Sequence, residues 1–170
     1  MSQSLKVNNL QVVVDATYRN THDFGTDIAK IFHSWVLALT NGTGSGNANF
    51  AWSDQITITA SSSSTIDLSS LTDRFGNAIA PTIIKLLMVR LTSSSDTAAT
   101  ISLGNAASNA WTPLLLNSSD LLKIRYQGFA LFACKDATGY AVGGSNKNLK
   151  ILNDSSTQSV VVDVAILGVK

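Results

Sequence analysis

Several residue types are scarce in this chain of 170 residues, and each shortage narrows what the protein can be. Glu is absent, so all eleven acidic residues are Asp. Glu favours helices whereas Asp favours caps and turns, so this composition indicates strands and turns. Charged residues make up only 14% of the chain, and the net charge is +1. With so little excess charge, we expect neither nucleic acid nor a membrane surface as a partner.

Cysteine and long apolar runs are also scarce. The single cysteine, Cys134, excludes an internal disulfide framework. It lies in the apolar stretch GFALFAC, which predicts a small buried thiol rather than a nucleophile. No apolar run approaches the roughly 18 residues of a membrane span, and the opening MSQSLKVNNL lacks the apolar segment of a secretory signal. We therefore expect synthesis in a cytoplasm.

What the chain has in abundance is alternation between apolar and polar residues. Such alternation is typical of strands with one buried face, and it occurs in LQVVVDATYR, QITITA, TIDLSSL, GFALFAC and SVVVDVAILGV. The SSSS between QITITA and TIDLSSL predicts a hairpin. TIIKLLMVRLT is apolar on both faces apart from Lys85 and Arg90, which predicts a central strand of a packed sheet.

The spacing of these segments predicts the fold class. About eight to ten short strands, with a turn signal about every ten residues, favour an all-β fold: an antiparallel β-sandwich of jelly-roll type. No helical segments alternate with the strands, so a parallel α/β sheet is not expected. We predict a single domain overall, with an irregular N-terminal arm and the first strand or strands in residues 1–53 and the sandwich in 54–170.

Residues 28–39 permit two interpretations. Ile28, Ile31, Phe32 and Trp35 fit the apolar stripe of a helix, whereas Trp35 and the residues after it alternate as in a strand. The Gly-rich TNGTGSGNAN that follows predicts a long loop.

The histidine and acidic residues do not follow the spacing of a known catalytic or metal-binding motif. His22 and His33 lie eleven residues apart, outside the regular strands, in no metal-binding pattern. The preference of Asp for turns explains most of the acidic residues. Oxygen ligands in NDSSTQ or SSSD suit Ca²⁺, although their spacing matches no EF-hand. We predict no catalytic residue, no cofactor and no metal site, and therefore a protein that is not an enzyme.

Several segments resemble a known group of proteins. GNANFAWSDQITITASSSSTIDLSSLTDRFGN, ISLGNAASNAW, KDATGYAV and LKILNDSSTQSVVVDVAILG are similar to small virion structural proteins of tailed bacteriophages, of jelly-roll or related β-sandwich fold. Several of those proteins resemble head decoration, or cement, proteins. The likeness covers roughly residues 10–168, although the segment HDFGTDIAKIFHSWVLAL, residues 22–39, is more apolar than the pattern. The resemblance implies a protein of the virion, with the major capsid protein or other virion proteins as partners.

The apolar N-terminal segment leads to a hypothesis about assembly. A sandwich of residues 54–170 can close its own core, so the apolar side chains before it need another surface. We expect that surface in a homo-dimer or trimer, or on a capsid shell. The candidate assembly contacts are Ile31, Phe32, Trp35, Leu39, Trp52 and Trp111.

A glycan- or receptor-binding module of a tail or fibre is the alternative function. Trp52, Trp111 and Tyr140 lie in or beside loops and are the candidates for a carbohydrate platform. Exposed aromatic residues beside Asp and Asn in one groove would favour glycan binding. An arm that reaches away from the sandwich would favour the assembly protein.

Overall fold

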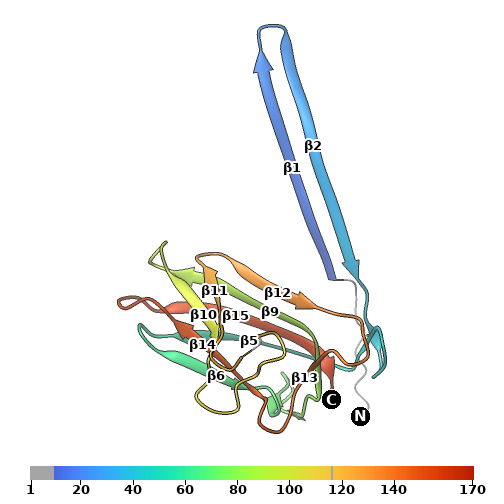
Figure 1. Cartoon of the computed structure of the whole chain (residues 1–170), viewed down its shortest axis with the longest axis vertical. Coiled ribbons are helices and arrows are strands. Elements are labelled where there is room, and N and C mark those ends of the chain that lie inside the picture. Colours follow the sequence, from blue (N-terminus) through green and yellow to red (C-terminus); the bar gives the residue numbers. More distant parts are fainter. Residues whose placement is uncertain (1–9, 116) are drawn as a thin grey trace.

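The computed structural model describes residues 10–115 and 117–170 as two antiparallel sheets packed face to face and a long hairpin that projects from them (Figure 1). The fold class predicted from the sequence, an all-β antiparallel sandwich, is confirmed. No helix occurs among the described residues. In this part of the chain there is accordingly no helix that could cross a membrane.

The smaller sheet of the sandwich has four strands. In spatial order they are β11 (Leu121–Arg125), β10 (Thr100–Gly104), β14 (Asn148–Asn153) and β6 (Ser63–Asp67).

The larger sheet is built around the two longest strands of the sandwich. Its order is β12 (Phe129–Ala133), β9 (Ile83–Ser94), β15 (Val160–Val169) and β5 (Phe50–Ile58), and β13 (Tyr140–Ala141) also pairs with β9. The central position predicted for the TIIKLLMVRLT segment is confirmed, because β9 lies between β12 and β15. Short pairs complete the described strands: β3 (Thr40–Asn41) with β4 (Asn47–Ala48), and β7 (Leu71–Thr72) with β8 (Ala78–Ile79).

The core lies between the two sheets and follows from the period of two. Burial alternates strictly along β14 and along most of β15, so one face of each strand is buried. Ile151, Val162 and Ile166 are fully buried on those faces. The indole of Trp111 closes the core near β13: its Nε1 donates to the carbonyl oxygen of Ala141 at 2.8 Å. All residues of the main core cluster lie between Phe50 and Ile166, so the sandwich forms this cluster without any residue of the hairpin.

The prediction that QITITA and TIDLSSL form a hairpin is wrong. These segments form β5 and β6, but β5 pairs with β15 and β6 pairs with β14, in different sheets. The SSSS turn therefore carries the chain from one sheet to the other. The expected boundary between residues 53 and 54 also differs from the structure, because β5 crosses it and Phe50 is already part of the core.

The N-terminal hairpin consists of β1 (Leu10–His22) and β2 (Gly25–Leu37), paired from Leu10↔Leu37 to His22↔Gly25. We call residues 10–37 the arm. Strands of 13 residues at about 3.4 Å per residue extend roughly 40 Å. Figure 1 shows the arm leaving one end of the sandwich and pointing away from both sheets. Of the two interpretations of residues 28–39, the structure therefore shows a strand for residues 28–37.

Candidate functional site: the arm and a groove beside β5

The two faces of the arm differ in composition. Directly opposite residues of an antiparallel pair share a face, and faces alternate along each strand. From the base of the arm to the pair of Tyr18 and Ala29, the register therefore places on one side, which we call the apolar face, Leu10, Val12, Val14, Ala16, Tyr18, Ala29, Ile31, His33, Trp35 and Leu37. Beyond that pair, the same side of the arm continues toward the tip with the polar pair Asn20 and Asp27. The other side, the mixed face, carries Gln11, Val13, Asp15, Thr17, Arg19, Ile28, Lys30, Phe32, Ser34 and Val36.

On the apolar face the side chains form a continuous apolar surface. His33 is the one polar residue within it, and its ring stacks on that of Trp35, with centroids 5.6 Å apart and planes at 19°. On the mixed face, by contrast, each apolar side chain lies opposite a polar one, as Phe32 lies opposite Asp15. Gln11 Nε2 also donates to Ser34 Oγ at 2.9 Å across this face.

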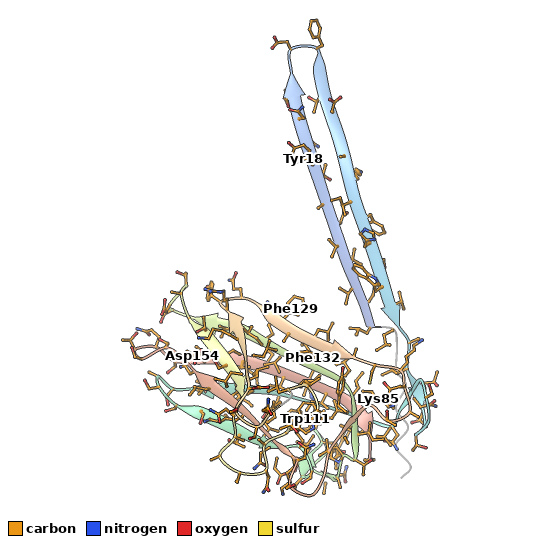
Figure 2. The ribbon with its side chains drawn as sticks, viewed as in Figure 1. Tyr18, Lys85, Trp111, Phe129, Phe132 and Asp154 are labelled. Atoms are coloured by element: carbon orange, nitrogen blue, oxygen red, sulfur yellow. The ribbon has the colours of Figure 1, made fainter. Side chains whose placement is uncertain are left out.

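The apolar face is open to solvent along most of its length. Tyr18 is 71% exposed, and Ile31 and Trp35 are each 56% exposed. Figure 2 shows the side chain of Tyr18 far from the sandwich. An uncovered apolar surface of this extent is typical of a site of protein–protein interaction.

The six candidate contacts predicted from the sequence fall into three places: the arm, the interior of the protein and a groove beside β5. Ile31 and Trp35 lie on the apolar face of the arm, and Phe32 lies on the mixed face. Leu39 is 1% exposed and Trp111 is 3% exposed. The side chains of Leu39 and Trp111 are therefore packed inside the protein and are not available as assembly contacts.

The sixth candidate, Trp52, lines a groove of about 610 Å³ beside the free edge of the larger sheet. Residues of β5, of its neighbour β15 and of the loop between β7 and β8 line this groove. Phe75 from that loop is 81% exposed, and Arg74 beside it donates from Nη2 to Ser53 Oγ at 3.0 Å. The groove thus combines aromatic side chains with a cation.

The carboxylate of Asp73 fixes the loop that carries Arg74 and Phe75. It accepts hydrogen bonds from the backbone N–H groups of Phe75 and Asn77, both at 2.8 Å, and from the amide of Asn77. This is the Asx-turn arrangement that Asp favours. The carboxylate is occupied by its own loop, so Arg74 and Phe75 are the side chains that the loop offers to a ligand.

The histidines do not form a metal site within one molecule. Both were expected outside the regular strands, but His22 ends β1 and His33 lies within β2. His33 pairs with Val14, which is eight residues from His22 along β1, so their backbones are separated by roughly 27 Å. Among the described side chains, no group of three or more His, Cys, Asp or Glu could hold a metal ion.

A third cluster surrounds Cys134, directly after β12. Burial raises the pKa of the Cys134 thiol, and the neighbouring Asp136 carboxylate raises it further. Asp136 accepts hydrogen bonds from Thr138 Oγ1 at 2.7 Å and from the N–H of Gly139, and these bonds lower its pKa to about 2. The fully buried Lys85 donates from Nζ to the carbonyl oxygen of Asp136. The cluster anchors a loop and keeps the thiol protonated.

Sequence reasoning missed two exposed aromatic residues. Phe24 occupies the turn at the tip of the arm, and Phe75 occupies the loop beside the groove. Each is an aromatic within a turn signal, HDFG or DRFGN. A large apolar side chain in such a setting has no strand face to bury it, and that signal alone marks it as available for contact. Nothing in the sequence shows that β5 lies beside the loop of Phe75.

Comparison with protein-family models gives no match to this chain. Comparison with curated proteins gives none either.

Proposed function

We propose that this chain is a non-enzymatic structural protein of a tailed-bacteriophage virion. In this proposal it is a decoration or cement protein that binds the head shell as a homo-oligomer and stabilises it. The observation that carries the proposal is the arm, which exposes a continuous apolar face away from the sandwich. The resemblance of the sequence to small virion proteins supplies the phage context.

The arm needs a second surface on energetic grounds. An isolated two-stranded hairpin is marginally stable in water, and further strands or a packed face are needed to hold it. Among residues 10–115 and 117–170, β1 and β2 pair only with each other, so no other described strand covers either edge of the arm. A second molecule that covers the apolar face supplies the missing packing.

The size of the apolar face suits such a contact. It carries ten side chains, of which the exposed aromatic residues each bury roughly 150–250 Å² when fully covered. The whole face offers on the order of 800 Å², about what each partner contributes to a standard stable interface. A particle that repeats this contact at symmetric positions multiplies its effect through avidity.

The charges of the arm predict how this binding depends on salt. Asp15, Arg19 and Lys30 lie on the mixed face, and Asp27 lies on the other side but beyond the apolar face, toward the tip. Docking through the apolar face therefore brings none of these four charges to the contact centre. We therefore expect shell binding to change little between low and moderate salt, because screening acts mainly on exposed charges.

The test is sedimentation of the purified full chain with head shells that lack it. We expect the protein to pellet with the shells at a fixed copy number and to raise the temperature at which they break open. The double substitution Val14→Thr and Ile31→Thr should weaken this binding tenfold or more, because it removes apolar contacts and adds hydroxyl groups that must be desolvated.

The arm offers a matched control. Val13 and Ile28 lie on the mixed face and are 48% and 56% exposed, against 45% and 56% for Val14 and Ile31. Val13→Thr with Ile28→Thr is therefore the same chemical change at the same exposure, and it should leave binding within a few-fold of the native protein. A folded protein that never pellets with the shells, or equal losses in both variants, would contradict the proposal.

A second candidate function is glycan binding, as in the tip of a tail or fibre. The groove favours it by placing Trp52 and Phe75 around polar groups of Asn49 and Arg74, an arrangement suited to sugar rings. Under this alternative, Phe75→Ala abolishes retention on immobilised host glycans while shell binding is absent from the start.

A further inference from the structure

The tip of the arm presents one aromatic side chain with no partner surface. Phe24 is 98% exposed in the two-residue turn that joins β1 to β2. Gly25 follows it with φ of 147°, a backbone conformation that other residues rarely adopt. Asp23 precedes it, so the tip combines a ring with a carboxylate.

The groove beside β5 has the complementary composition. The residues that line it include Trp52, the exposed Phe75 and Arg74, and the core residues Phe50 and Ile79, each 3% exposed, lie beneath them. Its volume of about 610 Å³ lies in the range of sites that enclose a ligand, and it exceeds one side chain. It can accept the whole turn, with the ring of Phe24 against Trp52 and Phe75 and the carboxylate of Asp23 near Arg74.

The tip cannot reach the groove of its own molecule. The arm extends roughly 40 Å as a paired ribbon, and Figure 1 shows it directed away from the sandwich. Any tip that occupies the groove must therefore come from another molecule.

We propose that the tip of the arm of one copy, Asp23 and Phe24, docks into the β5 groove of a second copy. Phe24 packs between Trp52 and Phe75, and Asp23 lies against Arg74. This inference deepens the proposed function, on which it rests, by naming the partner of the tip as a second copy of this chain. Aromatic burial supplies most of the affinity, and the charge pair orients the contact.

The contact is heterologous, because one copy gives a tip and the other gives a groove. Each copy keeps an unused tip or groove, so the contact repeats head to tail and forms a closed ring or an open chain. Because the two halves of the contact differ, two variants that each lack a different half should still associate with one another.

The test mixes two full-length variants that each lack one half of the contact. Phe24→Ser removes the tip, and Phe75→Ser alters the groove at an exposed residue. Each variant alone should self-associate about thirtyfold more weakly than the native chain, the size of an interface hot spot. An equimolar mixture, with one variant isotope-labelled, should give one-to-one heterodimers in native mass spectrometry, because one intact tip and one intact groove remain.

Phe129→Ser is the matched control, since Phe129 is 61% exposed on β12, away from the groove lining. It should self-associate like the native chain. Asp23→Lys should weaken self-association several-fold if the carboxylate lies against Arg74. Native-like association of Phe24→Ser, or a mixture without heterodimers, overturns the inference. The inference is also overturned if an immobilised glycan retains the protein through this groove while Phe75→Ser leaves self-association unchanged.

The outcomes for the tip and for the proposed function are separable. Tip docking is measured between copies in solution without shells, whereas the proposed function is measured on shells with variants of the apolar face. Loss of heterodimers with intact shell binding overturns only the tip contact. Heterodimers without shell binding overturn only the virion role.

Discussion

The imidazole of His33 stacks on the indole of Trp35, two residues along the same strand, with ring centroids 5.6 Å apart. The stack gives the largest side chain of the apolar face one packing neighbour while leaving it 56% exposed. A stacked, largely exposed aromatic residue near the base of the arm has the character of an interface anchor.

Trp35→Ala should therefore weaken shell binding by about 2 kcal/mol or more, roughly thirtyfold, while leaving the sandwich folded. Val36→Ala is the control, because Val36 is 54% exposed on the mixed face. Sedimentation with shells measures the affinity, and urea unfolding measures the stability of the sandwich. Equal effects of the two substitutions on binding would argue against the apolar face.

Trp111 should behave in the opposite way, because it belongs to the core. Its ring meets that of Tyr140 edge to face at 6.3 Å, and its Nε1 bonds to the carbonyl oxygen of Ala141. Trp111→Ala should lower the free energy of unfolding by about 3–5 kcal/mol. Trp111→Phe should lower it by about 1–3 kcal/mol, since it leaves a buried carbonyl oxygen without its donor. A Trp111→Ala protein as stable as the native chain in urea would place Trp111 outside the core.

The sequence predicted the strands of the sandwich because a period of two needs only local information. The partner of β5 was predicted wrongly, because β5 pairs with a strand far along the chain: Gln55 donates a hydrogen bond to Asp163, 108 positions away. A turn signal shows that the chain reverses but not which sheet the next strand joins. The helical stripe at Ile28, Ile31, Phe32 and Trp35 is a coincidence of two strand faces: Ile31 and Trp35 lie on one, Ile28 and Phe32 on the other.

The sites were harder to predict than the strands. Trp35 and Ile31 were found because they are apolar in a segment that the sandwich does not need. Trp111 was misplaced because its sequence neighbours are polar loop residues, whereas its indole reaches Ala141, 30 positions away. The groove could not be predicted from the sequence, because the loop of Phe75 meets β5 only in the folded protein.

Acid should destabilise the sandwich over a defined range. Hydrogen bonds from Thr138 and Gly139 lower the pKa of Asp136 to about 2. Hydrogen bonds from Thr92 and Gln55 likewise lower the pKa of Asp163. The unfolded chain, with Asp pKa values near 3.9, then binds more protons than the folded chain.

The stabilisation from these carboxylates is therefore fully present above about pH 4 and is lost as the pH falls toward 2. Urea midpoints measured from pH 6 to pH 2 should stay level and then decline below about pH 4. Asp136→Asn keeps an acceptor oxygen but does not titrate, so its decline should be shallower than that of the native chain. Stability that rises between pH 4 and pH 2 would reverse the expected sign.

Cys134 should react slowly with thiol reagents in the folded protein. Burial and the nearby Asp136 raise its pKa, so the reactive thiolate is scarce near pH 8. Labelling there should be about tenfold slower than for free cysteine, and urea should restore the ordinary rate. Rapid labelling without urea would show that the thiol is accessible and activated.

Removing the arm should separate folding from assembly. Leu10 and Leu37 are directly paired at its base, so an Asn-Gly turn in place of residues 11–36 closes the hairpin there with the shortest common loop. This excision keeps Leu39, which is 1% exposed, whereas deletion of residues 1–40 would remove a core side chain. Because the main core cluster lies between Phe50 and Ile166, the excised protein should retain a cooperative urea transition close to that of the native chain.

Shell binding and head-to-tail association should both disappear in the excised protein, since the apolar face and the tip are gone. Deletion of residues 1–40 should additionally lower the free energy of unfolding by about 2–5 kcal/mol, the usual result of losing a buried Leu side chain. Outright unfolding of the excised protein would show that the sandwich depends on the arm. Full shell binding without the arm would move the docking surface to the sandwich itself.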